Sequence, residues 1–333
     1  MSISKKIARS YVLPLALLFK ADKYFLSKKE KTCCIINFHG VRKHNENVFN
    51  NRHVPEREFE RIIRYLNKNY NIVPLKELFE IHRRKESPSK KTIALTFDDG
   101  YENNFTIALP ILKKYNTPAT FFIISKSLIE DNFASWPDVI DVVKKYHGQD
   151  ITVDNLNFEY PHYHNKEKGE LLNYLKTRGD QAEAIAHKLL GNHDYFQKEL
   201  KASPELLANI TGRNFAAYAN EPLIEFGSHT HTHPSLEYLT KDKVEMELKE
   251  SKQILESKIG KPVLSLAFPD GSYNKETLSI AKDLGYLNMV AVNYYFKENN
   301  QDPNLLSRFT ISNSTTFESN VLRLSRDFDL YGF

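Results

Sequence analysis

The sequence predicts an α/β fold in which strands and helices alternate along most of the chain, as in a parallel sheet or a βα barrel. Short apolar runs typical of buried strands are followed by segments whose apolar residues recur at helical spacing. In addition, the side chains suited to metal binding and proton transfer come directly after strand-like runs. In βα barrels these carboxyl-terminal strand ends form the active face.

The individual elements follow from local patterns. Thr240 caps one long helix, and Gly260 with Pro262 ends it. The predicted strands occupy residues 32–38, 92–97, 118–124, 223–227, 263–268 and 288–293. The predicted helices occupy residues 55–70, 75–84, 103–115, 240–259 and 275–284.

Composition limits the class of protein. The chain has 333 residues, of which 41% are hydrophobic, enough for one large domain or two ordinary ones. Acidic residues are interleaved with basic ones and the net charge is +4, so no nucleic-acid partner is expected. Cys33 and Cys34 are adjacent in an apolar run and are interpreted as buried thiols, which favours a reducing compartment. A cytoplasmic or membrane-associated location is therefore favoured over a secreted one.

Residues 1–30 are predicted to form an N-terminal helix. Basic residues precede a short apolar stretch at 11–19, which is too short to span a bilayer. The helix could pack on its own domain, or residues 5–26 could contact a membrane surface. A signal peptide is the third alternative, although no small-residue cleavage site precedes Cys33.

The pattern changes in the middle of the chain. Residues 126–220 contain helix-like pieces at 139–146, 170–178 and 181–190, together with Trp136, the only tryptophan. This region is predicted to be a helical insertion over the mouth of a barrel built from residues 31–125 and 221–333.

Asp98 and Asp99 follow the predicted strand 92–97. Two adjacent carboxylates at a strand end are unfavourable unless something pairs with them, which suggests a metal on one and proton transfer by the other. His229 and His233, four residues apart, would complete a three-ligand site with Asp99. Zinc is the default ion, although cobalt, nickel or iron would also fit. His231, between the two histidines, is expected to point elsewhere.

These groups predict a hydrolysis. A water bound to the metal would attack an amide or ester carbonyl, and Asp98 would accept its proton. The metal and a backbone N–H of the Pro269-Asp270-Gly271 turn would hold the oxyanion. His39, at the end of the first predicted strand, would face the same pocket and protonate the leaving amine.

The TFDDG segment at 96–100 and the HTHTHP segment at 229–234 resemble the polysaccharide deacetylase (NodB-homology) family. The resemblance implies a distorted (β/α) barrel and metal-dependent removal of acetyl groups from sugars. It implies Asp98 as catalytic base, and Asp99, His229 and His233 as metal ligands.

Residues 268–273 resemble the third motif of that family, a wall of the substrate groove. The resemblance implies that Pro269, Asp270 and Tyr273 lie at the substrate, with the N–H of Asp270 aimed at the oxyanion. Many members carry an arginine two residues before this proline, where this chain has Ala267. Arg308 is the candidate replacement.

The catalytic acid of many members is a histidine on the last strand, but this chain has no histidine after His233. The IINFH run that ends at His39 resembles the same motif moved to the N-terminus, as in the poly-N-acetylglucosamine deacetylase branch. His39 is therefore implied as the acid.

The predicted function is removal of N-acetyl groups from an amino sugar or polysaccharide. A deacylase of a nucleotide-linked, lipid-linked or formylated sugar is a second hypothesis. A non-catalytic carbohydrate-binding barrel is a third, supported by the missing third-motif arginine. The insertion could hold the specificity. Trp136 could stack on a sugar ring, although a packing role is the favoured interpretation.

Overall fold

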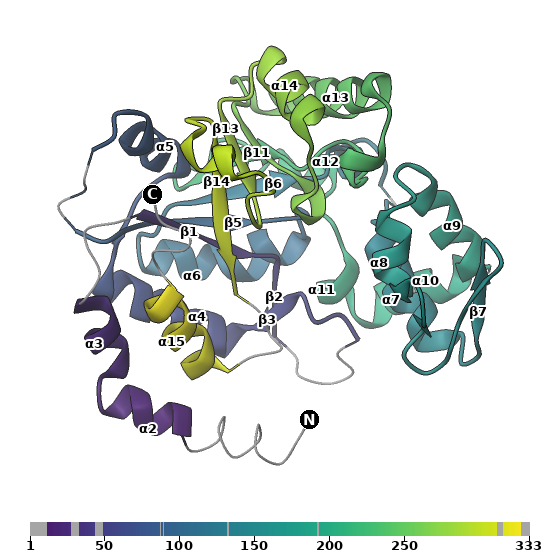
Figure 1. The fold of residues 1–333 in the computed structure, drawn as a ribbon, viewed down its shortest axis with the longest axis horizontal. Coiled ribbons are helices and arrows are strands. Elements are labelled where there is room, and N and C mark those ends of the chain that lie inside the picture. Colours follow the sequence, from purple (N-terminus) through teal and green to yellow (C-terminus); the bar gives the residue numbers. More distant parts are fainter. Residues whose placement is uncertain are drawn as a thin grey trace.

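The computed structural model describes residues 12–27, 33–43, 49–86, 88, 90–131, 133–191, 193–311 and 316–327. Seven parallel strands close into a barrel in the order β1-β14-β13-β12-β11-β6-β5, and β5 pairs with β1 (Figure 1). The strands are β1 (Cys33–Phe38), β5 (Thr92–Phe97), β6 (Ala119–Ile123), β11 (Ile224–Ser228), β12 (Ser265–Ala267), β13 (Asn288–Ala291) and β14 (Leu305–Thr310). The predicted (β/α) barrel is confirmed, with β14 as a strand that the sequence analysis did not assign.

Helices surround this barrel. The helices α4 (Glu56–Asn69), α5 (Leu75–Arg83), α13 (Lys241–Ile259) and α14 (Lys275–Asp283) match the predicted ones closely. The predicted helix 103–115 is a π-helical stretch, Asn104–Ala108, followed by α6 (Leu109–Lys114). The short strand β4 (Asn71–Ile72) pairs with the start of β5, and β2 (Gly40–Arg42) pairs with β3 (His53–Pro55). Helix α15 (Phe317–Asp327) follows β14 and was not predicted.

The alternation of side chains along each strand sorts them into two cores. Along β1, Cys33 and Ile35 belong to a small apolar cluster that also contains inward residues of other strands and residues of α5. Cys34 and Ile36 belong to the larger cluster shared with the surrounding helices. Continuing the same alternation toward the carboxyl end of β1 brings Asn37 and then His39 to the inside of the barrel. The strand period therefore carries polar residues to the barrel mouth.

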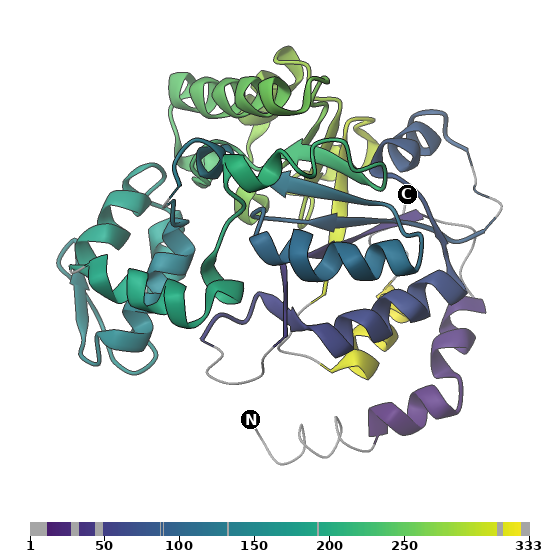
Figure 2. The same cartoon turned by 180° about the vertical axis from the view of Figure 1, so that it is seen from behind.

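Residues between β6 and β11 have a core cluster of their own. Figure 2 shows this region as a separate lobe beside the barrel. Its helices are α7 (Trp136–Tyr146), α8 (Leu171–Lys176), α9 (Gln181–Leu190), α10 (His193–Ala202) and α11 (Pro204–Leu207). It also contains the short antiparallel pairs β7 (Ile151–Val153) with β8 (Leu156–Phe158) and β9 (His164–Asn165) with β10 (Gly169–Glu170). Helix α12 (Gly212–Phe215) instead packs on the barrel, where Phe215 joins the larger core cluster. Helices make up most of the insertion, as predicted, and it also contains two short hairpins that were not predicted. Asp154 and Asn155, both at positive φ, form the turn between β7 and β8.

Two short N-terminal helices, α2 (Leu13–Leu18) and α3 (Ala21–Ser27), pack against α15 at the edge of the molecule (Figure 1). Asp22 in α3 accepts a hydrogen bond from the Tyr65 hydroxyl of α4, which fixes α3 to the barrel. Among the described residues, no helix is both long and apolar enough to cross a lipid bilayer.

Candidate active site

Three side chains converge at the carboxyl-terminal mouth of the barrel. Asp99 follows β5, and His229 and His233 lie in the loop after β11. The Nε2 atoms of both histidines lie 3.4 Å from Oδ1 of Asp99. One ligand atom from each of the three residues lies within 4.8 Å of the others, and all three are buried. Within the part of the chain that the structure describes, this is the group of three that could hold a metal ion.

The loop between the two histidines has a defined conformation. Thr230 and His233 adopt positive φ angles of 65° and 66°, so the chain turns tightly enough to aim both imidazoles inward. Thr230 Oγ1 accepts a hydrogen bond from the His233 N–H. Both oxygens of Glu247, on α13, accept hydrogen bonds from Thr232, and one of them also accepts from the His231 N–H. The His231 ring lies beside Ser125 and Glu250 and away from the other two histidines, as expected.

The donor set fits a divalent metal. His229 Nδ1 lies 2.9 Å from the Ala267 carbonyl oxygen, a hydrogen bond that leaves Nε2 free to bind an ion. Burial opposes the charge on Asp99, but hydrogen bonds from His229 and His233 hold its pKa well below the ordinary value. A carboxylate that stays ionised and two imidazoles form a face suited to zinc, cobalt, nickel or iron.

Asp98 is held beside this group by an arginine. Arg308 donates from Nη1 to Oδ1 of Asp98 at 2.7 Å and from Nη2 to Oδ2 at 2.8 Å. Burial opposes ionisation of Asp98, but the Arg308 guanidinium outweighs it and lowers the pKa of the carboxyl. The two-pronged contact also fixes the orientation of the carboxylate. Arg308 of β14 therefore contacts Asp98 in this chain, which has Ala267 where many family members carry an arginine.

A polar layer inside the barrel supports this pair. Asn37 donates to Oδ2 of Asp98 at 3.0 Å, and its own oxygen accepts from Arg308 and from Thr96. These residues come from β1, β5 and β14, which are neighbours in the barrel. Buried polar groups of this kind are tolerated because nearly every donor and acceptor has a partner.

His39 lines the same pocket and is only partly buried. Burial lowers the pKa of its imidazole, while Asp99 and Asp98 act in the opposite direction. Arg52 also lines the pocket and was not predicted. Its guanidinium binds Asp138 and Asp141 of α7 and donates to the Tyr101 hydroxyl, so it joins the barrel to the insertion.

Asp270 lies on the opposite wall. Its φ of 57° is unusual for a residue other than glycine. Its carboxylate accepts from Ser235 at 3.1 Å and forms an ion pair with Lys176 of α8 at 2.7 Å. Burial opposes the charge, yet these partners keep the Asp270 pKa below its ordinary value. Lys176 was not predicted to belong to the site.

The structure corrects the predicted substrate contacts Pro269 and Tyr273, and it gives Trp136 the packing role that was the favoured interpretation. Trp136 is only 1% exposed, and its indole Nε1 donates to the His233 carbonyl at 2.9 Å, so it supports the histidine loop and presents no face to a sugar. Tyr273 is 0% exposed, and its hydroxyl accepts from the Tyr295 N–H and from Asn299. Pro269 is buried and does not line the pocket. Both Pro269 and Tyr273 support the wall from behind.

The pocket at the mouth has a volume of about 330 Å³. Its wall combines barrel residues with Pro137, Leu172 and Lys176 of the insertion. The predicted site residues that line it are His39, Asp98, Asp99, His229, His233, Asp270 and Arg308. Arg52 and Lys176 had no local sequence signal, because nothing near either residue indicates which pocket the folded chain brings it to.

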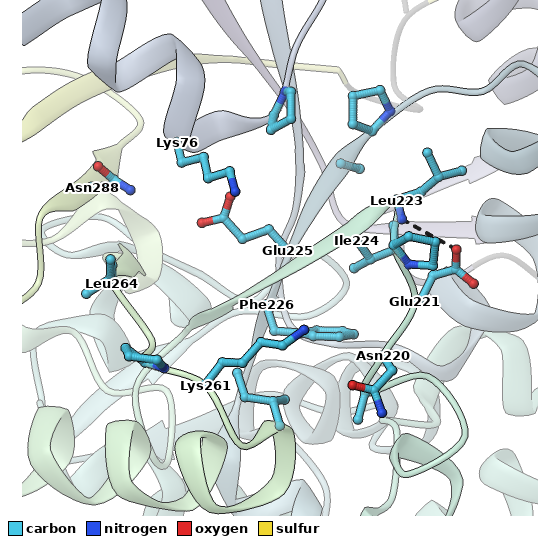
Figure 3. Close-up of a pocket in the computed structure, with 17 residues that line it drawn as sticks. Lys76, Asn220, Glu221, Leu223, Ile224, Glu225, Phe226, Lys261, Leu264 and Asn288 are labelled. Atoms are coloured by element: carbon cyan, nitrogen blue, oxygen red, sulfur yellow. Dashed lines mark hydrogen bonds between the residues drawn. The ribbon is translucent and has the colours of Figure 1, made fainter.

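A second cavity, of about 480 Å³, lies at the other end of the barrel, where the strands begin (Figure 3). Figure 3 shows Glu225 and Lys76 approaching each other across it, with Lys261 on the opposite side. Although it is the larger cavity, none of the three converging metal-binding side chains lines it. The candidate metal site therefore belongs to the smaller pocket at the mouth.

The family model for polysaccharide deacetylases matches residues 85–219 and 213–289, more than half of the chain. The chain belongs to the polysaccharide deacetylase family. The matched range contains both aspartates, both histidines and the turn at Asp270. His39 and Arg308 lie outside it, yet the fold brings both side chains into the same pocket as the matched residues.

Two curated relatives illustrate the family. The YxkH protein of Bacillus subtilis is 25% identical over 244 residues, which cover 73% of this chain and 60% of that protein. The poly-beta-1,6-N-acetyl-D-glucosamine N-deacetylase of Staphylococcus aureus is 28% identical over 195 residues, covering 55% of this chain and 66% of the relative. The chain thus matches less than two thirds of the length of each.

Solved structures share the fold. The Streptococcus pyogenes deacetylase PplD, solved in complex with acetate, aligns with a TM-score of 0.57 and 21% identity, covering 89% of this chain and 98% of PplD. IcaB from Ammonifex degensii aligns with a TM-score of 0.56 and 13% identity, covering 90% and 98% of the two chains. The shared fold therefore extends over most of the chain.

Proposed function

We propose that this protein hydrolyses the N-acetyl group of an amino sugar or polysaccharide, releasing acetate and a free amine. One observation carries the proposal. The Asp98 carboxylate, which accepts two hydrogen bonds from Arg308, lies next to the buried group of Asp99, His229 and His233, which we call the triad. The similarity to a poly-beta-1,6-N-acetyl-D-glucosamine N-deacetylase supports an N-acetylated glycan as substrate.

The residues have complementary roles in this reaction. Asp99, His229 and His233 would hold a divalent metal, which supplies Lewis-acid activation of water and of the acetyl carbonyl. Asp98 accepts the proton of the attacking water, and Arg308 keeps its carboxylate ionised and oriented. The Asp270 turn offers its backbone N–H to the oxyanion. His39 returns a proton to the nitrogen as the C–N bond breaks.

The experiment is acetate release and amine formation from N-acetylated monosaccharides, oligomers, polymers and lipid-linked sugars. Treatment with a chelator should abolish release, and zinc, cobalt, nickel or iron should be tested for restoring it. Acetate release that is unaffected by complete metal removal would contradict the assigned roles of the triad. Glycan binding without release by metal-replete protein would favour the carbohydrate-binding hypothesis.

We also propose that the N-terminal helices contact a lipid surface. Leu18 and Phe19 are 73% and 80% exposed, and Val12 and Leu15 extend the same apolar strip on α2. The opposite side of α2 packs against α15, so this helix has apolar residues on both sides. The sequence places basic residues on both flanks, namely Lys5, Lys6, Arg9, Lys20 and Lys23. Apolar residues flanked by basic ones suit an anionic membrane surface.

Sedimentation with vesicles tests this contact. Wild type should bind vesicles of phosphatidylglycerol and phosphatidylcholine more than vesicles of phosphatidylcholine alone, and Leu18→Asp with Phe19→Asp should reduce binding. Met246→Asp, an exposed apolar position on α13, is the matched control. Equal vesicle binding by the double variant, the control and wild type would contradict the proposal. A membrane contact would also favour lipid-linked sugars among the substrates.

A further inference from the structure

The insertion reaches the candidate site through one charged side chain. Lys176 is the last residue of α8, and its ammonium lies 2.7 Å from Oδ1 of Asp270. Pro137 and Leu172 of the insertion line the same pocket, but both are apolar. Among the described insertion residues that line the pocket, Lys176 is therefore the one that can exert a directed electrostatic force on its wall.

The partner of Lys176 occupies a strained position. Asp270 has a φ of 57° and ψ of 8°, a left-handed conformation that is unfavourable for a side chain with a Cβ atom. It is followed by Gly271, whose φ is also positive. Such a conformation persists only where its surroundings hold it. Here the Asp270 carboxylate is held from two sides, by Ser235 of the histidine loop and by Lys176 of the insertion.

We propose that Lys176 is a positioning residue for the reaction, which fixes the Asp270 turn through its ion pair and so makes activity depend on a docked insertion. The inference rests on the proposed function, because it assumes that the Asp270 N–H stabilises the oxyanion. An N–H that serves only the transition state affects kcat, whereas a residue that holds the sugar affects KM.

The test is Lys176→Met, with kcat, KM and metal content measured on the acetylated glycan that wild type cleaves fastest. The ammonium is partly exposed, so the variant should fold. We expect kcat to fall about 10- to 100-fold, the effect of displacing an oxyanion donor without removing it. KM should stay within about twofold, because Lys176 acts through the turn. Lys176→Arg, which can still pair with Asp270, should recover most of kcat.

A matched control separates positioning from general docking. Lys243 of α13 pairs with Asp180 of the insertion, and neither residue lines the pocket. Lys243→Met should therefore leave kcat near that of wild type. In addition, the double variant Lys176→Met with Asp270→Asn should have a kcat no lower than that of the less active single variant. Both substitutions remove the same Lys176–Asp270 ion pair, so their effects should not add.

The outcomes are distinguishable. If wild type releases no acetate from any glycan, the proposed function fails before the role of Lys176 is tested. If wild type is active, unchanged kcat in Lys176→Met overturns the inference, and so does a raised KM at normal kcat, which would indicate direct substrate binding. An equal loss of kcat in Lys243→Met would also overturn it, because insertion docking would then matter without the Asp270 contact.

Discussion

At the scale of single residues, Arg308 provides the counter-charge for the buried carboxylate of Asp98. It lies in the barrel interior and pairs with Asp98, also buried, through two hydrogen bonds. Arg308→Met should destabilise the fold by about 3–5 kcal/mol, because it leaves a buried carboxylate without its counter-charge. Arg308→Lys should lose less stability than Arg308→Met, because lysine keeps the positive charge although it cannot make both hydrogen bonds to Asp98. Denaturant unfolding measures both effects.

The same variant also tests the role of Arg308 in the reaction. Turnover should fall in Arg308→Met while the metal content stays normal, because Arg308 contacts none of the three metal-binding side chains. A variant that is both as stable and as active as wild type would contradict the account of Asp98.

Trp136 provides a second prediction at this scale. Its indole N–H satisfies the carbonyl of His233, one of the proposed metal ligands. Trp136→Phe should cost about 1–3 kcal/mol of stability by leaving that buried acceptor without a donor. Metal affinity should fall with it, and KM for the glycan should not change. A raised KM with unaltered metal affinity would instead restore the sugar-stacking role.

How far the site could be predicted also becomes clear residue by residue. Asp98, Asp99, His229 and His233 follow predicted strands, so their convergence at one barrel end could be expected from the chain alone. Tyr273 was placed at the substrate because its segment resembles a family motif, and sugar stacking was the less favoured of two interpretations of Trp136. Burial of both shows that residue type does not indicate which way a side chain points. Lys176 could not be found, because its position depends on how the insertion docks.

At the scale of elements, strand β1 shows how a period of two organises the barrel. Cys33 packs in the inner cluster and Cys34 in the outer one, so adjacent thiols lie on opposite sides of the strand. The same alternation explains why Asn37 and His39 face the mouth. Strand β14 was not predicted. It contains Arg308, and an arginine can lie inside a barrel only with a partner from elsewhere in the fold, which here is Asp98.

The two thiols allow a direct check of this strand. Burial raises the pKa of Cys33 to about 12 and that of Cys34 further, so neither thiol ionises appreciably at neutral pH. Because the thiolate is the reactive form, a disulfide-exchange reagent should label the native protein very slowly. Labelling of both thiols should become rapid once denaturant unfolds the chain, and raising the pH should have little effect before unfolding begins. Rapid labelling of the native protein would show that β1 is less protected than described.

At the scale of the whole molecule, the protein is a family barrel with a second small core beside its mouth. The contacts between the two include the ion pairs of Arg52 with Asp138 and Asp141, of Lys176 with Asp270, and of Lys243 with Asp180. Phe49, from the barrel side, also packs against the core of the insertion. The change of sequence pattern in the middle of the chain predicted an insertion at this place, but its ionic contacts with the barrel depend on the folded arrangement.

The most direct test of the central claim is a paired measurement of bound metal and acetate release in wild type and Asp98→Asn, on a panel of N-acetylated glycans. Asp98 makes no contact with an ion in this account, so both proteins should carry metal. Wild type should release acetate, and the variant should be slower by about 100-fold or more, as expected for the loss of a general base. Near-normal turnover by Asp98→Asn, or a wild type that binds no metal when supplied with it, would contradict the account.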